Sequence, residues 1–229
     1  MKSKNLLFIL PVFLCSIIGN AQNAESRAIN DFTKIDVWGN IKIELQKSDS
    51  NSLYIDAKSV PLDEIVTEVK NDVLKIKMRS NLFKDVVINI KINYKEIVDI
   101  KANASAELIF PNKIVAEKLT VESIGGARVV LDVELKNSDL TVYQGGQVDI
   151  KGKSDFANVF ANSGGILSAT NLITDEANIK LNTGGKCEIT VNKKLVARVN
   201  TKSSLSYFGK PEIEEIKTSL GANVSKWDE

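Results

Sequence analysis

The chain of 229 residues contains no histidine. Histidine is the most common general base, a member of the usual nucleophilic triads and the commonest zinc ligand, so its absence removes the usual routes to hydrolysis and metal catalysis. Aromatic residues make up only 6% of the chain, and its two tryptophans are Trp38 and Trp227. We therefore predict a protein that is not an enzyme and that needs no cofactor or metal ion.

Neither an excess of charge nor an abundance of cysteine marks the sequence. The formal net charge is +1 at pH 7. The chain therefore lacks the strongly positive charge that is typical of a protein that binds nucleic acid. The two cysteines are Cys15 and Cys187, and Cys15 lies in a predicted leader. No intramolecular disulfide is therefore expected in the mature chain, and Cys187 is interpreted as a small buried hydrophobic side chain.

Long hydrophobic runs are confined to the first residues. Lys2 and Lys4 precede an apolar run over residues 6–18, and residues 19–21 offer the small side chains of a cleavage site. This pattern predicts a secretory signal peptide over residues 1–21. Lipidation of Cys15 is a less favoured alternative because the large Leu14 precedes it. No later run approaches about 18 apolar residues, so we expect an exported chain without a transmembrane segment, in the periplasm or at the cell surface.

What the sequence does contain is a repeat. Four glycine pairs recur, and successive pairs begin 20, 19 and 20 residues apart. A fixed period of this size is typical of a solenoid. Glycine adopts positive φ at corners and lets neighbouring backbones approach closely, so we interpret the pairs as structural corners without a ligand role. The eight residues are Gly125, Gly126, Gly145, Gly146, Gly164, Gly165, Gly184 and Gly185.

Short runs of strand-forming residues lie between the glycine pairs. Examples are LTVY at 140–143 and NIKL at 178–181, each bounded by residues that favour turns. Coils of about 20 residues with two or three short strands fit a parallel β-helix, whose neighbouring coils stack about 4.8 Å apart. Residues 101–205 sustain no apolar pattern with helical period. The predicted fold is therefore all-β, a β-helix of stacked coils.

A single β-helix domain is predicted over residues 22–229, in three parts. Residues 22–100 alternate apolar and polar side chains with period two, which predicts strands with one face inward. Residues 101–205 hold the repeating coils. Residues 206–229 depart from the period and carry a charged stretch, which suits a C-terminal cap over the open end of a solenoid.

Asparagine, serine and threonine recur among the coils and offer many hydrogen-bond donors and acceptors. Such rows on a flat solenoid face suit recognition of a glycan or a protein surface. The alternative is that stacked asparagines satisfy the backbone groups of neighbouring turns. The candidate binding face is represented by Asn158, Asn162, Asn178 and Asn182.

Two further segments indicate a family. Residues 32–45 read FTKIDVWGNIKIEL and residues 207–211 read YFGKP. Together with the glycine-pair coils, they resemble the head GIN domain family of autotransporter adhesins, secreted proteins common in Bacteroidetes. The resemblance covers about residues 29–227, although the family's terminal Ser-Gly-Ala-Gly-like segment is weakened here to SLGA at 219–222. It implies a right-handed parallel β-helix, a role as a cell-surface adhesin and no catalytic residues to carry over.

Three functions are compatible with these observations. The leading hypothesis is a non-enzymatic, exported adhesin or interaction module of the cell envelope, whose partner is an unidentified surface glycan or protein. The second is a structural envelope protein that forms homo-oligomers. The third is a carbohydrate-active β-helix enzyme, which needs clustered carboxylates on one outer face. Asp149 and Glu188 share a repeat position, but Ser168 occupies it in the coil between them, so no carboxylate ladder is predicted.

Overall fold

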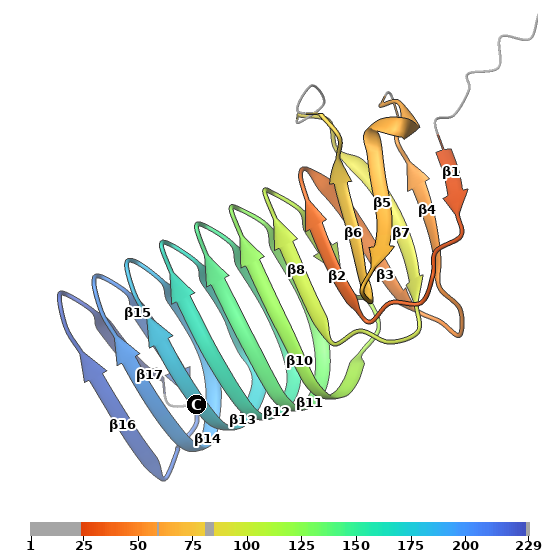
Figure 1. The fold of residues 1–229 in the computed structure, drawn as a ribbon. Helices are drawn as coiled ribbons and strands as arrows, with labels where there is room; N and C mark the ends of the chain where they lie inside the picture. Colours follow the sequence, from red (N-terminus) through yellow and green to blue (C-terminus); the bar gives the residue numbers. More distant parts are fainter. Residues whose placement is uncertain (1–23, 59, 81–84, 228–229) are drawn as a thin grey trace, which may run out of the picture.

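The structure is a computed structural model that describes residues 24–58, 60–80 and 85–227. The predicted signal peptide, residues 1–21, lies outside these residues. The described chain is 69% strand, and its helical content is the short 3₁₀ turn η1 (Leu62–Glu64). The predicted all-β solenoid is confirmed, since the chain forms about seven parallel stacked turns roughly 19 residues apart (Figure 1).

Five long strands build the middle of the solenoid. They are β10 (Ile114–Ile124), β11 (Arg128–Tyr143), β12 (Gln147–Asn162), β13 (Ile166–Leu181) and β14 (Lys186–Val199). Neighbours in this series pair in parallel over most of their length. Figure 1 shows them as a stack, with tight turns along one edge and wide bends along the other.

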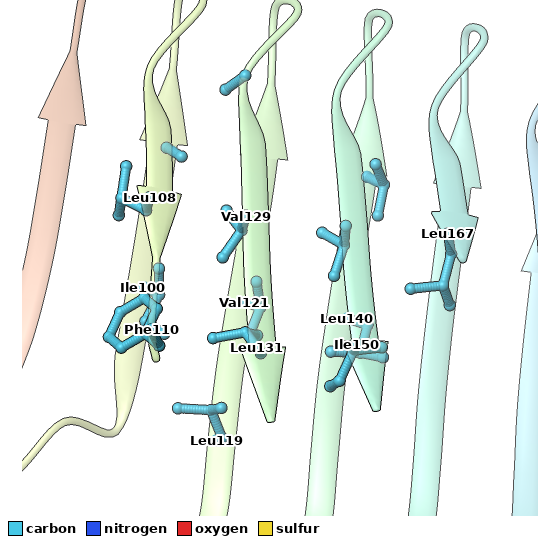
Figure 2. Packing of buried hydrophobic residues seen from close by; sticks show 14 of the residues in the cluster. Ile100, Leu108, Phe110, Leu119, Val121, Val129, Leu131, Leu140, Ile150 and Leu167 are labelled. Carbon is cyan, nitrogen blue, oxygen red and sulfur yellow. The ribbon is translucent and has the colours of Figure 1, made fainter. Parts of the chain in front are cut away.

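Each coil has two walls. The first wall holds the strand portion that follows a tight turn, such as residues 128–135, and the second wall holds the portion before the next tight turn, such as residues 138–143. Alternate side chains point inward from both walls, as a strand requires. Val129 projects from the first wall, and Val121 and Leu140 project from the second; all three are almost completely buried (Figure 2). Burial of one such side chain contributes about 1.5–3 kcal/mol, so this column of apolar contacts is a main stabilising feature.

The wide bends bury hydroxyl groups rather than charges. Ser138, Ser154 and Thr174 are fully buried where the strands turn from one wall to the other. The Ser138 and Ser154 hydroxyls lie 3.1 Å apart, and the Thr174 hydroxyl donates to the carbonyl oxygen of Thr190 over 2.6 Å. These bonds satisfy polar groups that would otherwise destabilise a buried corner.

The N-terminal coils are stacked out of chain order. β2 (Lys34–Trp38) and β3 (Ile41–Lys47) form the first coil of the chain, and β6 (Val73–Met78) and β7 (Ile88–Tyr94) form the second. β2 pairs in parallel with β6, and β3 pairs in parallel with β7. The predicted alternation is confirmed in these strands, because their apolar positions point inward.

The third coil joins these two to the long strands. It consists of β8 (Asp99–Asn103) and β9 (Glu107–Ile109), which pair in parallel with β2 and β3 on one side and with β10 and β11 on the other. The first coil of the chain therefore lies between the second and the third. This order did not follow from the sequence.

Antiparallel strands close the N-terminal end. β4 (Ser52–Asp56) pairs with β7, β1 (Ala24–Arg27) pairs with β4, and β5 (Ile65–Lys70) pairs with β6. The Arg27 guanidinium donates to the carbonyl oxygens of Leu62 and Ile65 over 2.9 and 2.8 Å. The two covering strands β1 and β5 are thus tied together.

The C-terminal end continues the stack. We expected residues 206–229 to depart from the repeat, whereas β15 (Ser204–Phe208), β16 (Ile213–Thr218) and β17 (Asn223–Trp227) add strands to both walls. In the last coil, Glu214 lies opposite the buried Leu195. Its carboxylate binds Lys226 at 2.6 Å and accepts from the Tyr207 hydroxyl over 2.9 Å.

Candidate binding face

Tight turns connect the second wall of one coil to the first wall of the next. Gln144 and Gly145 have φ values of 52° and 74°, and the N–H of Gly146 donates to the carbonyl oxygen of Tyr143 over 3.1 Å. Positive φ at two successive residues is typical of a type I′ turn. The same pairs of positive φ recur at Ser163, Gly164, Thr183 and Gly184.

The two glycines of a pair meet different requirements. Gly164 has a φ of 74°, and a Cβ added there would meet nothing within 4 Å, so backbone conformation alone favours glycine. A Cβ added at Gly165 would lie 2.2 Å from the carbonyl oxygen of Val142 in the preceding coil, so close approach excludes any side chain. Gly145 and Gly184 share the first role, and Gly146 and Gly185 share the second.

The first glycine pair lies one residue earlier in its turn than the other three. Gly125 and Gly126 both have positive φ, at 62° and 76°, and Ala127 takes the position of close approach. Neighbouring turns stack through their backbones, since the N–H of Gly126 donates to the carbonyl oxygen of Gln144 over 3.1 Å. The glycine pairs thus lie along the turn edge of the solenoid.

The outer surface of the second wall carries three parallel rows of side chains. Each row takes one residue from successive coils, and we name them the turn-side row, the central row and the bend-side row. In the coil of β13 these rows hold Asn182, which directly follows the strand, Lys180 and Asn178, respectively. Across the stack the central row reads Lys75, Asp36, Lys101, Glu122, Thr141, Phe160, Lys180, Arg198 and Lys217.

All four predicted asparagines lie on this wall, in the two outer rows. In the bend-side row, the Asn178 amide donates to Asn158 Oδ1 over 3.4 Å. In the turn-side row, the Asn200 amide donates to Asn182 Oδ1 over 3.1 Å. Asn162 accepts from the adjacent backbone N–H of Ser163 over 2.8 Å, within its own turn. The other three predicted asparagines are linked to amides along their rows.

The central row separates these amide rows and changes character along the solenoid. Towards the N-terminal end its charges alternate, and Lys101 Nζ lies 3.2 Å from Glu122 Oε2, a bond that raises the pKa of Lys101. Phe160 and Lys180 follow further along, with Nζ 5.9 Å from the ring centroid. Arg198 and Lys217 continue the row. Within the described ranges, none of the last three cations forms an ion pair.

A hollow of about 840 Å³ lies at the N-terminal end of the same wall. Trp38 and Asp36 line it, and Trp38 is 57% exposed. The Asn103 amide donates to the Asp36 carboxylate over 3.2 Å. The sequence did not place Trp38 at a site, although the alternation of Ile35 and Val37, both buried, with their neighbours implies that Trp38 points outward.

Two of the groups considered for catalysis are buried or paired: the thiol of Cys187 and the carboxylate of Asp149. Cys187 is buried, and desolvation raises the pKa of its thiol well above the usual range, so the reactive thiolate is disfavoured. On the first wall, Ser168 lies between Asp149 and Glu188, as the repeat register predicted. The Asp149 carboxylate is bound by the Arg128 guanidinium at 2.6 Å.

Metal clusters and membrane spans are both absent from the part of the chain that the structure describes. There, no group of three or more histidine, cysteine, aspartate or glutamate side chains is arranged to hold a metal ion. The same residues include no helix that is long and apolar enough to cross a membrane.

Comparisons with known proteins match this geometry. The family described as "Putative auto-transporter adhesin, head GIN domain" matches residues 31–211. A "putative adhesin" from Bacteroides fragilis is similar, with a TM-score of 0.81 at 18% identity, over 89% of this chain and 96% of that one. A "putative adhesin" from Parabacteroides merdae gives a TM-score of 0.73 at 19% identity, over 91% and 98%. A "putative lipid binding protein" from Parabacteroides distasonis gives 0.69 at 21% identity, over 89% and 97%.

The fold and the outer rows define a class of protein, the parallel β-solenoids with polar walls. Within that class, the chain belongs to the head GIN domain family, as the segment at residues 32–45 predicted. At these levels of identity the solved structures support the fold alone. No curated protein matches the sequence.

Proposed function

We propose that the protein is a non-enzymatic adhesion or interaction module of the bacterial cell envelope, and that it binds its partner through the outer surface of the second wall. The three-row arrangement on that wall carries the proposal. Amide side chains such as Asn178 and Asn182 offer both donors and acceptors. Because strands hold these side chains at fixed spacing, little conformational freedom is lost when a partner binds.

Export is part of the proposal. The pattern of residues 1–21, with two lysines before an apolar run, supports a signal peptide. The description of the family as adhesins supports a location in which the second wall could meet a partner. The non-enzymatic part is supported by the ion pair that engages Asp149 and by the burial of Cys187.

Protease treatment of intact cells tests the proposal. The amount of chain is compared before and after treatment, with a known periplasmic protein as the control for membrane integrity. Loss of the chain while the control survives is the expected result. Full protection until the outer membrane is opened would contradict the role in adhesion at the surface.

Self-association is a second candidate, favoured by the last coil. In the described residues, β16 pairs only with β14 and β17 pairs only with β15, which leaves one edge of each strand open. Ile213, Leu220 and Trp227 are exposed beside these edges. An open strand edge with apolar neighbours is a template for pairing with another chain. Light scattering of the purified protein, with Ile213→Lys as the variant, would detect an oligomer that the variant dissociates.

A further inference from the structure

Charged residues that face each other in neighbouring coils of the solenoid are mostly of opposite sign. On the first wall, Arg128 binds both Glu107 in one neighbouring coil and Asp149 in the other, at 3.5 and 2.6 Å. Opposite charges at facing positions stabilise neighbouring strands, whereas like charges at facing positions destabilise them. Other pairs between coils are Lys42–Glu107, Lys101–Glu122, Lys118–Asp139, Lys136–Glu117, Lys151–Asp132 and Lys193–Asp175.

The end of the central row departs from this rule. Lys180 faces Arg198 and Arg198 faces Lys217 in the registers of β13, β14 and β16, so three cations lie opposite one another in consecutive coils. The nearest acidic position along β16 is Glu215, two residues from Lys217 and in the bend-side row. The fold does not neutralise the mutual repulsion of these three cations, which points to a bound ligand that neutralises it. Departures from the pairing of opposite charges are expected at functional sites.

The surroundings of the three cations are largely polar. Asn178 and Asn182 flank Lys180 in one coil, and Val196 and Asn200 flank Arg198 in the next. Phe160 precedes Lys180 in the same row and is half-buried. The cations and amides thus form one strip along the solenoid axis, which we name the basic strip: Lys180, Arg198 and Lys217, with Asn178, Asn182 and Asn200.

We propose that the basic strip binds an acidic polysaccharide, a polymer whose sugars carry carboxylate, sulfate or phosphate groups, lying along the axis of the solenoid. The proposal rests on the proposed function and specifies its partner. The Arg198 guanidinium can hold a planar anionic group with two hydrogen bonds, and the flanking ammonium groups neutralise further charges. The amides of Asn178 and Asn182 can donate to and accept from sugar hydroxyls.

The geometry favours a polysaccharide over other anionic partners. The cations repeat once per coil, about 4.8 Å apart, along a single line, which suits a linear polymer with regularly repeated charge. A lipid surface generally requires exposed apolar side chains beside the cations, whereas amides flank Lys180 and the apolar neighbours of the strip, Phe160 and Val196, are half-buried. A nucleic-acid ligand generally requires a strongly basic surface, and the net charge of the chain is only +1.

Binding to paired polymers tests the proposal with purified mature chain. Polygalacturonate and its full methyl ester share a backbone but differ in charge, and dextran sulfate and dextran give the same comparison for sulfate. We expect binding to at least one acidic polymer and not to its neutral counterpart, and weakening of that binding as salt screens the charges. Arg198→Glu should weaken the binding at least about tenfold, because it removes a charge-assisted contact and introduces repulsion.

A matched control separates position from net charge. Lys186 is exposed on the first wall of the same strand, so Lys186→Glu changes the net charge equally but leaves the basic strip intact. Its affinity should stay within about twofold of the wild type, since an exposed charge outside the contact has little effect. Arg198→Gln, which removes charge without reversing it, should fall between the two. Thermal unfolding of each variant confirms that it is folded.

Several results would overturn the proposal. They are equal affinity of the wild type and Arg198→Glu, equal loss in Lys186→Glu, binding to the neutral polymers, or no binding to either acidic polymer. Preference for vesicles of anionic phospholipid over both acidic polymers would replace the polysaccharide with a lipid surface. The proposed function fails separately, in the protease experiment on intact cells, so a chain that is exposed on cells but indifferent to Arg198→Glu would lose only this inference.

Discussion

The N-terminal and C-terminal halves of the central row use charge in opposite ways. In the N-terminal half, Asp36 lies between Lys75 and Lys101, and Glu122 follows Lys101. In the C-terminal half, the row ends with cations in three consecutive coils. The alternating charges of the N-terminal half neutralise one another, whereas the cations of the C-terminal half remain available to bind an anionic partner. The same backbone can therefore support either surface, and the outward residues alone decide which.

The turns also differ along the stack. Ala106 and Ala127 occupy the position of close approach in the N-terminal turns, Gly146, Gly165 and Gly185 occupy it in the middle turns, and Ser203 and Ala222 occupy it in the last two turns. A Cβ is thus accommodated at both ends of the stack but would strike the preceding backbone at the three middle turns. The middle turns are therefore the more sensitive to substitution at this position.

The largest effect is expected from Gly165→Ala. The added Cβ would lie 2.2 Å from the carbonyl oxygen of Val142, so the coils must move apart, at a cost of about 3 kcal/mol or more in the free energy of unfolding. Denaturant unfolding measures this loss. Labelling of Cys187 provides a local measure, because its buried thiol should react faster when the neighbouring coils separate.

Two controls sharpen the comparison of turns. Gly164→Ala meets no atom within 4 Å and should cost only about 1–2 kcal/mol, the penalty for a left-handed conformation. Ala127→Gly, at the equivalent close-approach position of the earlier turn, should cost about 0.5–1 kcal/mol through backbone entropy. Equal losses for Gly164→Ala and Gly165→Ala would contradict the distinction between the two glycines.

A smaller loss of stability is expected when a cation replaces Glu122, so that the charges of the N-terminal half of the central row no longer alternate. Glu122→Lys places a cation opposite Lys101 and removes the carboxylate that accepts from the Tyr143 hydroxyl over 3.2 Å. The free energy of unfolding should fall by about 1–2 kcal/mol. Glu122→Gln, which keeps an acceptor and adds no charge, should lose less. High salt should recover part of the loss in Glu122→Lys, and a loss independent of salt would argue against a charge effect.

A gain in stability is expected from a substitution in the turn that contains Thr183. Its φ is 49°, a conformation that β-branched residues avoid, whereas Gly125 holds the equivalent position of an earlier turn. Thr183→Asn should raise the free energy of unfolding by about 0.5–1 kcal/mol, since asparagine tolerates the left-handed region. A lower melting temperature would show that the threonine side chain makes a stabilising contact.

The smallest expected effect is on stability at acid pH, through Glu214 in the last coil. The hydrogen bond from Lys226, with a further one from Tyr207, lowers the pKa of Glu214 below its ordinary value of about 4.3. The folded state therefore binds this proton less readily than the unfolded state, and the stabilisation is present above that ordinary value and is lost as pH falls through the folded pKa. Glu214→Gln should flatten this part of the pH profile by less than about 1 kcal/mol, because the pair is partly exposed.

Much of the fold could be predicted from local patterns. The spacing of glycine pairs gives the coil length, and alternation in segments such as residues 41–45 gives the inward face. The insertion of β2 and β3 between later coils could not be predicted, because pairing between distant strands leaves no short-range signal. The continuation through β16 was missed because Glu214 and Lys226 replace apolar residues at inward positions.

The candidate face was only partly visible in the sequence. The repeat period placed Asn158 near Asn178 and Asn162 near Asn182, and these four residues share one wall. The sequence does not predict that Lys180 and Arg198 face each other, because their separation of 18 residues differs from the glycine spacing. Only the observed register of β13 against β14, with its irregularities, brings the two cations opposite each other.

The most direct test of the account is a joint measurement on Arg198→Glu. The variant places a carboxylate between Lys180 and Lys217 and so restores the alternation of charge that the N-terminal half already shows. Its melting temperature should therefore rise, by an amount equivalent to about 0.5–1 kcal/mol. Its affinity for the acidic polymer that the wild type binds should fall at least about tenfold. A rise in melting temperature together with a fall in affinity would show that the repulsion among the cations of the basic strip lowers stability and that the same cations are needed for binding. A fall in both quantities, or unchanged affinity with raised stability, would contradict the account.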